Sequence, residues 1–205
     1  MSEMARQRGL VLGVTGAAGS GKSTVTHMLA LLGAQTIDAD ALVRWAYNDA
    51  AFRAKVVGRF GVGILDVHGG IDRGKLAEIV FQNTESLADL ERLVHPAVLD
   101  QMAESIETYR AEPDREPVLA LEVPLLFEAG AEAMVDRVLT VTAGEETRTR
   151  RLAQRGWDAK RIAAVDRSQM PLAEKVSRAD YIIDADGSLE DTATRVEALW
   201  RRILE

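Results

Sequence analysis

The segment Gly16-Ala-Ala-Gly-Ser-Gly-Lys-Ser23 decides how this chain folds and what it binds. It matches the pattern G-x-x-x-x-G-K-[ST] at every fixed position. An apolar run at Leu10–Val14 precedes it and is typical of a buried strand, and a helical pattern follows over Ser23–Leu32. In this setting the glycines let successive backbone N–H groups turn towards one anion, and the dipole of the following helix strengthens the attraction.

We therefore predict a site for a nucleoside triphosphate. Lys22 is expected to reach the β- and γ-phosphates, and Ser23 to place its hydroxyl on Mg²⁺. The alternative is a glycine-rich turn with a chance lysine, which the strand–loop–helix setting disfavours. The residues expected to hold ATP are Gly16, Ala17, Ala18, Gly19, Ser20, Gly21, Lys22, Ser23 and Thr24.

Further apolar runs alternate with helical stretches along the rest of the chain. The region from Ala41 to about Tyr109 reads as mostly helical, and Glu112–Pro117 reads as a loop. Strands separated by helices imply a parallel sheet of the α/β class. The other predicted strands are Gln35–Ile37, Val118–Val123, Arg137–Thr142 and Tyr181–Asp184, and the later helices are Glu145–Asp166 and Leu189–Leu204.

Composition excludes several classes of function. The 205 residues contain no cysteine, so disulfides, thiolate metal sites and cysteine nucleophiles are ruled out. The net charge of −7 argues against a general nucleic-acid binder, although 20 of the 25 cationic residues are arginine, whose planar fork suits phosphate. No apolar run approaches the ~18 residues of a membrane-spanning helix, and the run after residue 9 is too short for a signal peptide. We expect a cytoplasmic protein with neither nucleic-acid nor membrane partners.

Two aspartates, Asp38 and Asp40, follow directly after the second predicted strand. Ligands of an open parallel sheet bind beyond the carboxyl ends of its strands, where the glycine-rich loop also lies. A carboxylate there could accept the proton of an acceptor hydroxyl. Alternatively, one of the two caps a helix that begins near Ala41, because aspartate is a favoured N-cap residue.

Three classes of triphosphate-binding protein fit the motif: small-molecule kinases, GTPase switches, and motor or assembly ATPases. The two asparagines, Asn48 and Asn83, do not precede a lysine, so the Asn-Lys-x-Asp loop typical of GTPases is missing. Motor ATPases usually have longer chains and a strand that ends in two acids, whereas Leu119–Val123 holds the single acid Glu122.

The chain resembles the dephospho-CoA kinases. The resemblance covers about residues 10 to 187, in family order. It rests on Gly13-Val-Thr-Gly, Gly19-Ser-Gly-Lys-Ser-Thr24, Ile37-Asp-Ala-Asp40 with Arg44, Leu93-Val-His-Pro96, Val123-Pro-Leu-Leu-Phe-Glu128, Gln169-Met-Pro171 and Ala179-Asp-Tyr-Ile-Ile-Asp184.

The resemblance implies ATP-dependent phosphorylation of the 3′-hydroxyl of the ribose in dephospho-CoA, which gives coenzyme A and ADP. It implies a three-layer α/β P-loop kinase core (residues 8–40, 117–143 and 176–205), a helical substrate domain (41–116) and a short helical lid (144–175). Asp40 matches the proposed base of the family. The residues expected to bind the acceptor are Asp38, Asp40, Arg44, His95, Pro124, Leu125, Leu126 and Glu128.

Two of these positions have a structural alternative. His95 could contact substrate or sit in a packed corner, and Pro96 after it favours an extended backbone at His95. Leu125, Leu126 and Phe127 are more typical of packing, although they could also form an apolar wall beside the pantetheine arm.

Glu122 departs from the family, which usually has aspartate at this strand end. We expect it to act on Mg²⁺ through water rather than as a direct ligand. The alternative is an acid solvated at the end of a strand.

Six arginines fall within Arg148–Arg167, and Arg148, Arg151 and Arg155 share one face of the predicted helix. Lid arginines of P-loop kinases neutralise the charge that develops during phosphoryl transfer, and Arg151 and Arg155 match this role best by resemblance. The alternative is a solvated helix whose arginines pair with Glu145, Glu146 and Asp158. The expected catalytic residues are Asp40, Lys22, Arg151 and Arg155.

Two other functions stay open at this point. One is another small-molecule kinase of the same core, acting on shikimate, gluconate or a nucleotide. The other is a non-catalytic nucleotide-binding protein. The sequence leaves the oligomeric state unassigned.

Overall fold

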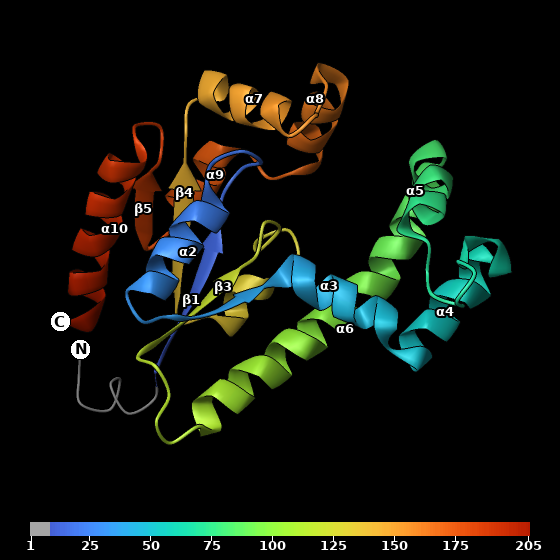
Figure 1. Cartoon of the computed structure of the whole chain (residues 1–205), viewed down its shortest axis with the longest axis horizontal. Helices are drawn as coiled ribbons and strands as arrows, with labels where there is room; N and C mark the ends of the chain where they lie inside the picture. The colour runs from blue at the N-terminus through green and yellow to red at the C-terminus, as the bar shows by residue number, and fades with distance from the viewer. Residues whose placement is uncertain (1–8) are drawn as a thin grey trace. The chain divides into compact units, whose positions relative to one another are not determined.

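The computed structural model describes residues 9–205, apart from the side chains of Phe81 and Thr84 (Figure 1). The chain forms two compact units. The first joins the residues up to Asp38 with Ile106–Glu205, and the second is Ala39–Ser105. Residues 144–175 belong to the first unit.

The first unit is built on five strands and the helices that cover them. The strands are β1 (Leu10–Thr15), β2 (Gln35–Asp38), β3 (Val118–Glu122), β4 (Arg137–Thr142) and β5 (Tyr181–Asp184). Its helices are α2 (Lys22–Leu31), the last turns of α6 (Thr84–Ala111), η2 (Ala131–Met134), α7 (Glu145–Gln154), α8 (Ala159–Ser168), α9 (Leu172–Ser177) and α10 (Leu189–Leu204).

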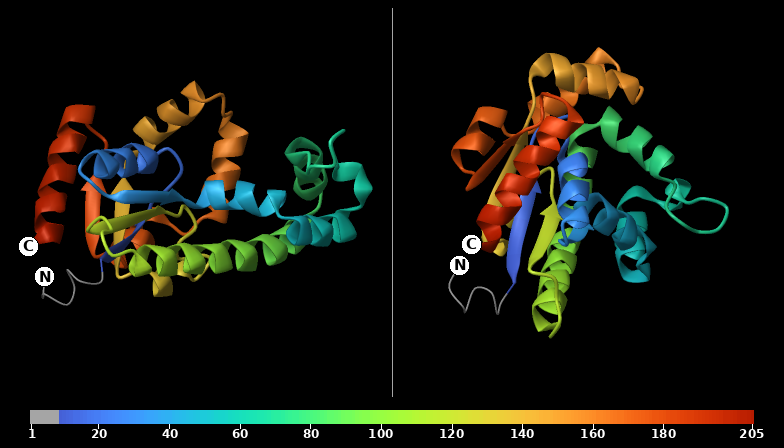
Figure 2. Two further views of the ribbon diagram at one scale, coloured as in Figure 1. Left: turned by 60° about the horizontal axis from the view of Figure 1, so that its bottom comes forward. Right: turned by 60° about the vertical axis from the view of Figure 1, so that its left-hand side comes forward.

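The five strands form one parallel sheet in the order β2-β3-β1-β4-β5. Helices α2 and α10 contact each other and cover one face, and α10 also packs along β5 (Figure 2). On the other face α9 packs against β4, and Leu126 and Val135 lie against Gly13 of β1. The fold is therefore a three-layer α/β sandwich, as the alternation of apolar runs and helical stretches predicted.

The register of the sheet aligns the strand ends that carry polar residues. Glu122 at the end of β3 pairs with Val14 of β1 on one side and with Asp38 of β2 on the other. Because all the strands are parallel, these positions share one edge of the sheet with the loop that follows β1. This edge therefore carries the candidate site.

The second unit is helical, as predicted for Ala41 to Tyr109. It contains α3 (Ala39–Asn48), α4 (Ala50–Phe60), η1 (Val62–Ile64), α5 (Arg73–Gln82) and most of α6. Asp49 and Asp72 accept hydrogen bonds from backbone N–H groups in the first turns of α4 and α5, which fixes where these helices begin. A core of its own holds it together, formed by Ala46, Phe52, Val56, Ile64, Leu76 and Val80.

Helix α6 corrects one prediction about His95. The helix runs through Pro96 without ending, so His95 is helical rather than extended. Pro96 cannot donate a hydrogen bond to the carbonyl four residues earlier. A helix of 28 residues retains many other hydrogen bonds, and these hold its axis through the proline.

Other element bounds differ by small amounts. Helix α3 begins at Ala39, two residues before the predicted start, so Asp40 lies in its first turn and does not cap it. The charged stretch predicted as one helix over Glu145–Asp166 is two helices, because α7 ends after Gln154 and Asp158 caps α8. Among residues 9–205, no helix is long and apolar enough to cross a membrane.

Candidate active site

The loop between β1 and α2 (residues 16–21, the phosphate loop) has a backbone that only glycine allows at key positions. Gly16 has φ +146°, and a Cβ there would lie 2.2 Å from the carbonyl oxygen of Val141. Gly19 has φ +76°, and a Cβ there would lie 2.9 Å from the carbonyl oxygen of Arg148. The glycines therefore serve both the left-handed turns and the close approach of neighbouring backbone.

Lys22 begins α2 and is buried. Its ammonium donates hydrogen bonds to the carbonyl oxygens of Gly16 at 3.1 Å and of Ala17 at 3.0 Å. The positive charge is thus held against the start of the phosphate loop. An anion that binds the loop would meet this ammonium, as the motif predicts.

Ser23 in the first turn of α2 and Glu122 at the end of β3 form a polar pair at this edge of the sheet. The Ser23 hydroxyl donates a hydrogen bond of 2.7 Å to Oε1 of Glu122. Glu122 is 9% exposed, so the alternative of a solvated acid at a strand end is wrong. The Glu122 carboxylate accepts a hydrogen bond from the Ser23 hydroxyl, as is expected of a residue that orients a metal ligand.

Helix α7 packs directly on the phosphate loop. Arg148 Nε donates to the Ala18 carbonyl at 3.0 Å, and the same side chain donates to both carboxylate oxygens of Asp166 at 2.6 and 2.7 Å. Arg151 donates through Nη2 to the Ala185 carbonyl at 2.7 Å, and its Nη1 lies 3.4 and 3.3 Å from the carbonyl oxygens of Gly19 and Ser20. The alternative of a solvated helix is therefore wrong for these two arginines.

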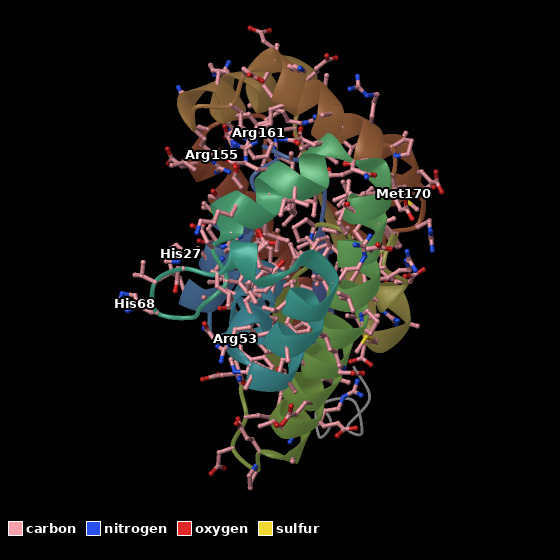
Figure 3. All side chains as sticks on the ribbon, turned by 90° about the vertical axis from the view of Figure 1, so that its right-hand side faces the viewer. His27, Arg53, His68, Arg155, Arg161 and Met170 are labelled. Carbon is pink, nitrogen blue, oxygen red and sulfur yellow. The ribbon has the colours of Figure 1, made fainter. Side chains whose placement is uncertain are left out.

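The start of α7 is anchored to the loop after β5. Asp186 accepts hydrogen bonds from the Thr147 hydroxyl and the Gly144 N–H, and these lower the pKa of its carboxyl. The end of α7 is different: Arg155, which Figure 3 labels, is the C-cap residue and is exposed. Arg161 on α8 stacks over the ring of Trp157 at 4.1 Å. Helix α8 has no buried residue among its ten.

The segment after β3 is fixed by a buried lysine. Lys175 of α9 is fully buried, and its Nζ lies 2.7 Å from the Pro124 carbonyl oxygen and 2.9 Å from Oε1 of Glu128. The same Oε1 accepts the Met170 N–H at 2.7 Å. The Thr15 hydroxyl also donates to Pro124, at 3.2 Å.

Apolar packing completes this segment. Leu126 and Phe127 are buried, as the packing interpretation predicts, and Leu125 is half-buried. Arg178 stacks over the ring of Phe127 at 4.3 Å.

The sequence-predicted site residues divide between the two units. The first unit carries the phosphate loop, Asp38, the segment from Pro124 to Glu128, and Arg151. The second unit carries Asp40 and Arg44 on α3 and His95 on α6. Asp40 follows Asp38 by two residues along the chain.

Comparison with known proteins decides the family. The family model described as dephospho-CoA kinase matches residues 10–191, which is most of the chain. The chain belongs to the dephospho-CoA kinase family. Among curated proteins, a dephospho-CoA kinase from Syntrophotalea carbinolica is 41% identical over an alignment of 204 residues, and the match covers 95% of this chain and 92% of that protein.

Solved structures agree with this membership. The dephospho-CoA kinase from Campylobacter jejuni superposes with a TM-score of 0.72 at 28% identity, and the match covers 94% of this chain and 96% of that one. A shikimate kinase from Acinetobacter baumannii in complex with shikimate gives a TM-score of 0.54 at 16% identity, covering 98% and 96% of the two chains. The second likeness shows the fold alone.

Sequence reasoning missed two residues of this dephospho-CoA kinase family member, Lys175 and Asp166. Lys175 lies in a helix of six residues, half of them polar, where a solvated side chain would be expected, yet it is fully buried. Asp166 lies on an exposed helix and pairs with Arg148, 18 residues earlier. No local pattern points to either pairing, because both depend on contacts between separate elements.

Proposed function

We propose that this chain transfers the γ-phosphoryl group of ATP to the 3′-hydroxyl of the ribose of dephospho-CoA, giving coenzyme A and ADP. The observation that carries the proposal is the phosphate loop with the Lys22 ammonium held against its first two carbonyls, and the Ser23 hydroxyl bonded to the buried Glu122. Membership of the dephospho-CoA kinase family supplies the acceptor, which the geometry of the loop does not specify.

The donor set at Ser23 suits Mg²⁺. A serine hydroxyl with a carboxylate behind it offers hard oxygen atoms, and Mg²⁺ usually takes its remaining ligands from water and substrate phosphates. Among residues 9–205 there is no cluster of three acids or histidines that could hold a metal ion by itself, which fits an ion brought in with the triphosphate. Ser23 would be the direct ligand, with Glu122 orienting it, and the bound ion would neutralise charge on the phosphates.

Asp40 would orient the acceptor hydroxyl and accept its proton. The ribose oxygen attacks the γ-phosphorus, the bond to the oxygen between the β- and γ-phosphorus atoms breaks, and ADP leaves. Because this transition state is loose, alignment of the hydroxyl contributes more than the basicity of Asp40. Asp38 at the end of β2 would help to hold the acceptor ribose.

The cations of the first unit would stabilise the transferring group. Lys22 would reach the β- and γ-phosphates once ATP occupies the loop. Arg151 and the exposed Arg155 would neutralise charge that develops in the transition state. Closure of the region around α8 over both substrates would exclude water and limit ATP hydrolysis.

The residues proposed to bind the acceptor are those named from the sequence. Arg44 and His95 would contribute polar contacts, and Pro124, Leu125 and Leu126 would form the apolar wall beside the pantetheine arm. Glu128 has a different assignment within this proposal, because its carboxylate already holds Lys175 and the Met170 N–H. We infer that Glu128 holds the segment that forms the apolar wall in place, through Lys175 and the Met170 N–H, rather than binding the acceptor itself.

A coupled assay of ADP release tests the function. ATP is supplied with dephospho-CoA, and separately with shikimate, gluconate or a nucleoside monophosphate. We expect ADP release above background only with dephospho-CoA. Release with another acceptor would favour the rival kinase, and no acceptor-dependent release would favour a non-catalytic nucleotide-binding protein.

The cytoplasmic location stays a prediction. Fractionation of cells that produce the tagged chain tests it, and recovery with the membrane fraction would contradict it.

A further inference from the structure

Arg148 makes three side-chain hydrogen bonds, and the function above does not use it. Its side chain is 11% exposed. It joins two elements, because Nε donates to the Ala18 carbonyl of the phosphate loop and Nη2 donates to both oxygens of Asp166 on α8. Its own backbone carbonyl lies against Gly19, where a Cβ would come within 2.9 Å of it. Arg148 thus touches the loop with both side chain and backbone.

Because of the geometry of the peptide bond, the contact between Arg148 and the Ala18 carbonyl also fixes the direction of the next N–H group. In a trans peptide the C=O and the following N–H point in opposite directions. Arg148 bonds to the Ala18 carbonyl oxygen, so this carbonyl points towards α7. The N–H of Gly19 belongs to the same peptide and therefore points the opposite way, away from α7. Backbone N–H groups facing one side are what an anion-binding loop needs.

The neighbouring peptide planes are held in a related way. Nη1 of Arg151 lies 3.4 Å from the Gly19 carbonyl oxygen and 3.3 Å from that of Ser20. These distances are at the long end for a hydrogen bond, whereas the Arg148 contact at 3.0 Å is well within the usual range. Arg148 is therefore the stronger restraint on the loop.

We propose that Arg148 is a positioning residue that pre-organises the phosphate loop for the phosphates of a nucleotide, with Asp166 orienting its guanidinium. Arg148 does this from outside the loop and need not touch the nucleotide. Without it the Ala18–Gly19 peptide is free to rotate, and the nucleotide must order that peptide on binding. The ligand is the polyphosphate of ADP or ATP, so the proposal rests on the nucleotide part of the proposed function.

Calorimetric titration with ADP tests the proposal independently of phosphoryl transfer. We expect Arg148→Met to weaken ADP binding about tenfold, consistent with the loss of one charge-assisted hydrogen bond. Arg148→Lys keeps the charge but lacks the Nε donor, so we expect a similar loss. Asp166→Asn keeps the shape and one acceptor oxygen, and it should weaken ADP binding by a smaller factor.

Arg150→Met is the matched control. Arg150 is exposed on the same helix, and its Nη2 lies 3.3 Å from the Thr147 hydroxyl rather than on the loop. This variant should bind ADP as the unsubstituted chain does. A loss of ADP affinity as large as that of Arg148→Met would show that overall positive charge, not the contact with Ala18, is responsible, and would overturn the proposal.

Steady-state kinetics separate positioning from a merely structural role. Positioning raises KM for ATP and leaves KM for dephospho-CoA unchanged. A structural role lowers the melting temperature of the ligand-free chain and leaves the ADP affinity of the folded fraction intact, and that result would overturn the proposal. If Arg148→Met does not fold, Arg148→Lys and Asp166→Asn carry the same test. If the chain binds ADP but never phosphorylates dephospho-CoA, the proposed function fails and the role of Arg148 is still decided.

Discussion

Replacement of Glu128 by glutamine would expose the energetic role of the buried lysine. The change conserves the volume of the side chain and keeps an oxygen that can accept from Met170 N–H and Lys175 Nζ. It removes only the negative charge. The ammonium of Lys175, whose side chain is 0% exposed, would then be left with neutral partners, Pro124 among them.

The magnitude follows from the burial of the pair. Removal of one partner from a buried ion pair costs about 3–5 kcal/mol, because the other charge stays buried without compensation. The side chain of Glu128 is 19% exposed and glutamine retains the acceptor, so we expect the lower end, about 3 kcal/mol. For a chain of this size 1 kcal/mol lowers the melting temperature by about 2–4 °C, so the expected decrease is about 6–12 °C.

Denaturant unfolding of the two proteins measures the difference in the free energy of unfolding. Glu197→Gln is the matched control, because Glu197 pairs with Arg201 at an exposed site and should cost about 0.5 kcal/mol or less. Addition of Lys175→Met to Glu128→Gln removes the stranded charge, so the double variant should be more stable than Glu128→Gln alone. A cost below about 1 kcal/mol for Glu128→Gln would refute the reasoning, because a buried, uncompensated ammonium cannot be that cheap.

Four further substitutions test the site and the fold. Asp40→Asn should lower kcat about 100-fold with little change in KM for ATP, and near-normal turnover would remove Asp40 as the base. Ser23→Ala should raise the Mg²⁺ concentration needed for half-maximal turnover about tenfold, with a smaller rise for Glu122→Gln; equal Mg²⁺ curves would contradict the assigned metal site. Burial raises the pKa of Tyr109 to about 12, above its ordinary value of 10.0, so the neutral form is favoured in the folded chain. Stability should therefore fall as the pH rises from about 10 to 12, and Tyr109→Phe should flatten that decline in pH-dependent unfolding.

Much of the fold follows from local patterns. The strands near Leu10, Arg137 and Tyr181 begin where the apolar runs begin, because a short run of buried residues between turn signals has few other solutions. The phosphate loop was predictable for the same reason: its glycines, lysine and serine are all local requirements of one turn.

Predictions failed where a longer element outweighed a local preference. Pro96 disfavours helix at His95, yet the hydrogen bonds of a 28-residue helix carry the chain through it. For Glu122 no prediction failed: the sequence left a solvated acid open as the alternative, and the alignment of β3 with β1 brings Glu122 against Ser23 in a buried setting.

The sequence by itself determined that this chain is an α/β protein with a triphosphate loop, and its motifs placed it with the dephospho-CoA kinases. Those features are local, since each depends on residues close together along the chain. Only the tertiary structure decided that Arg148 holds the loop from outside and that Lys175 is buried on Glu128. These pairings join residues 130 and 47 positions apart, as the spacings of Arg148 from Ala18 and of Lys175 from Glu128 show. No pattern within one helix or strand encodes them, because packing of separate elements brings the charges together and excludes water around them.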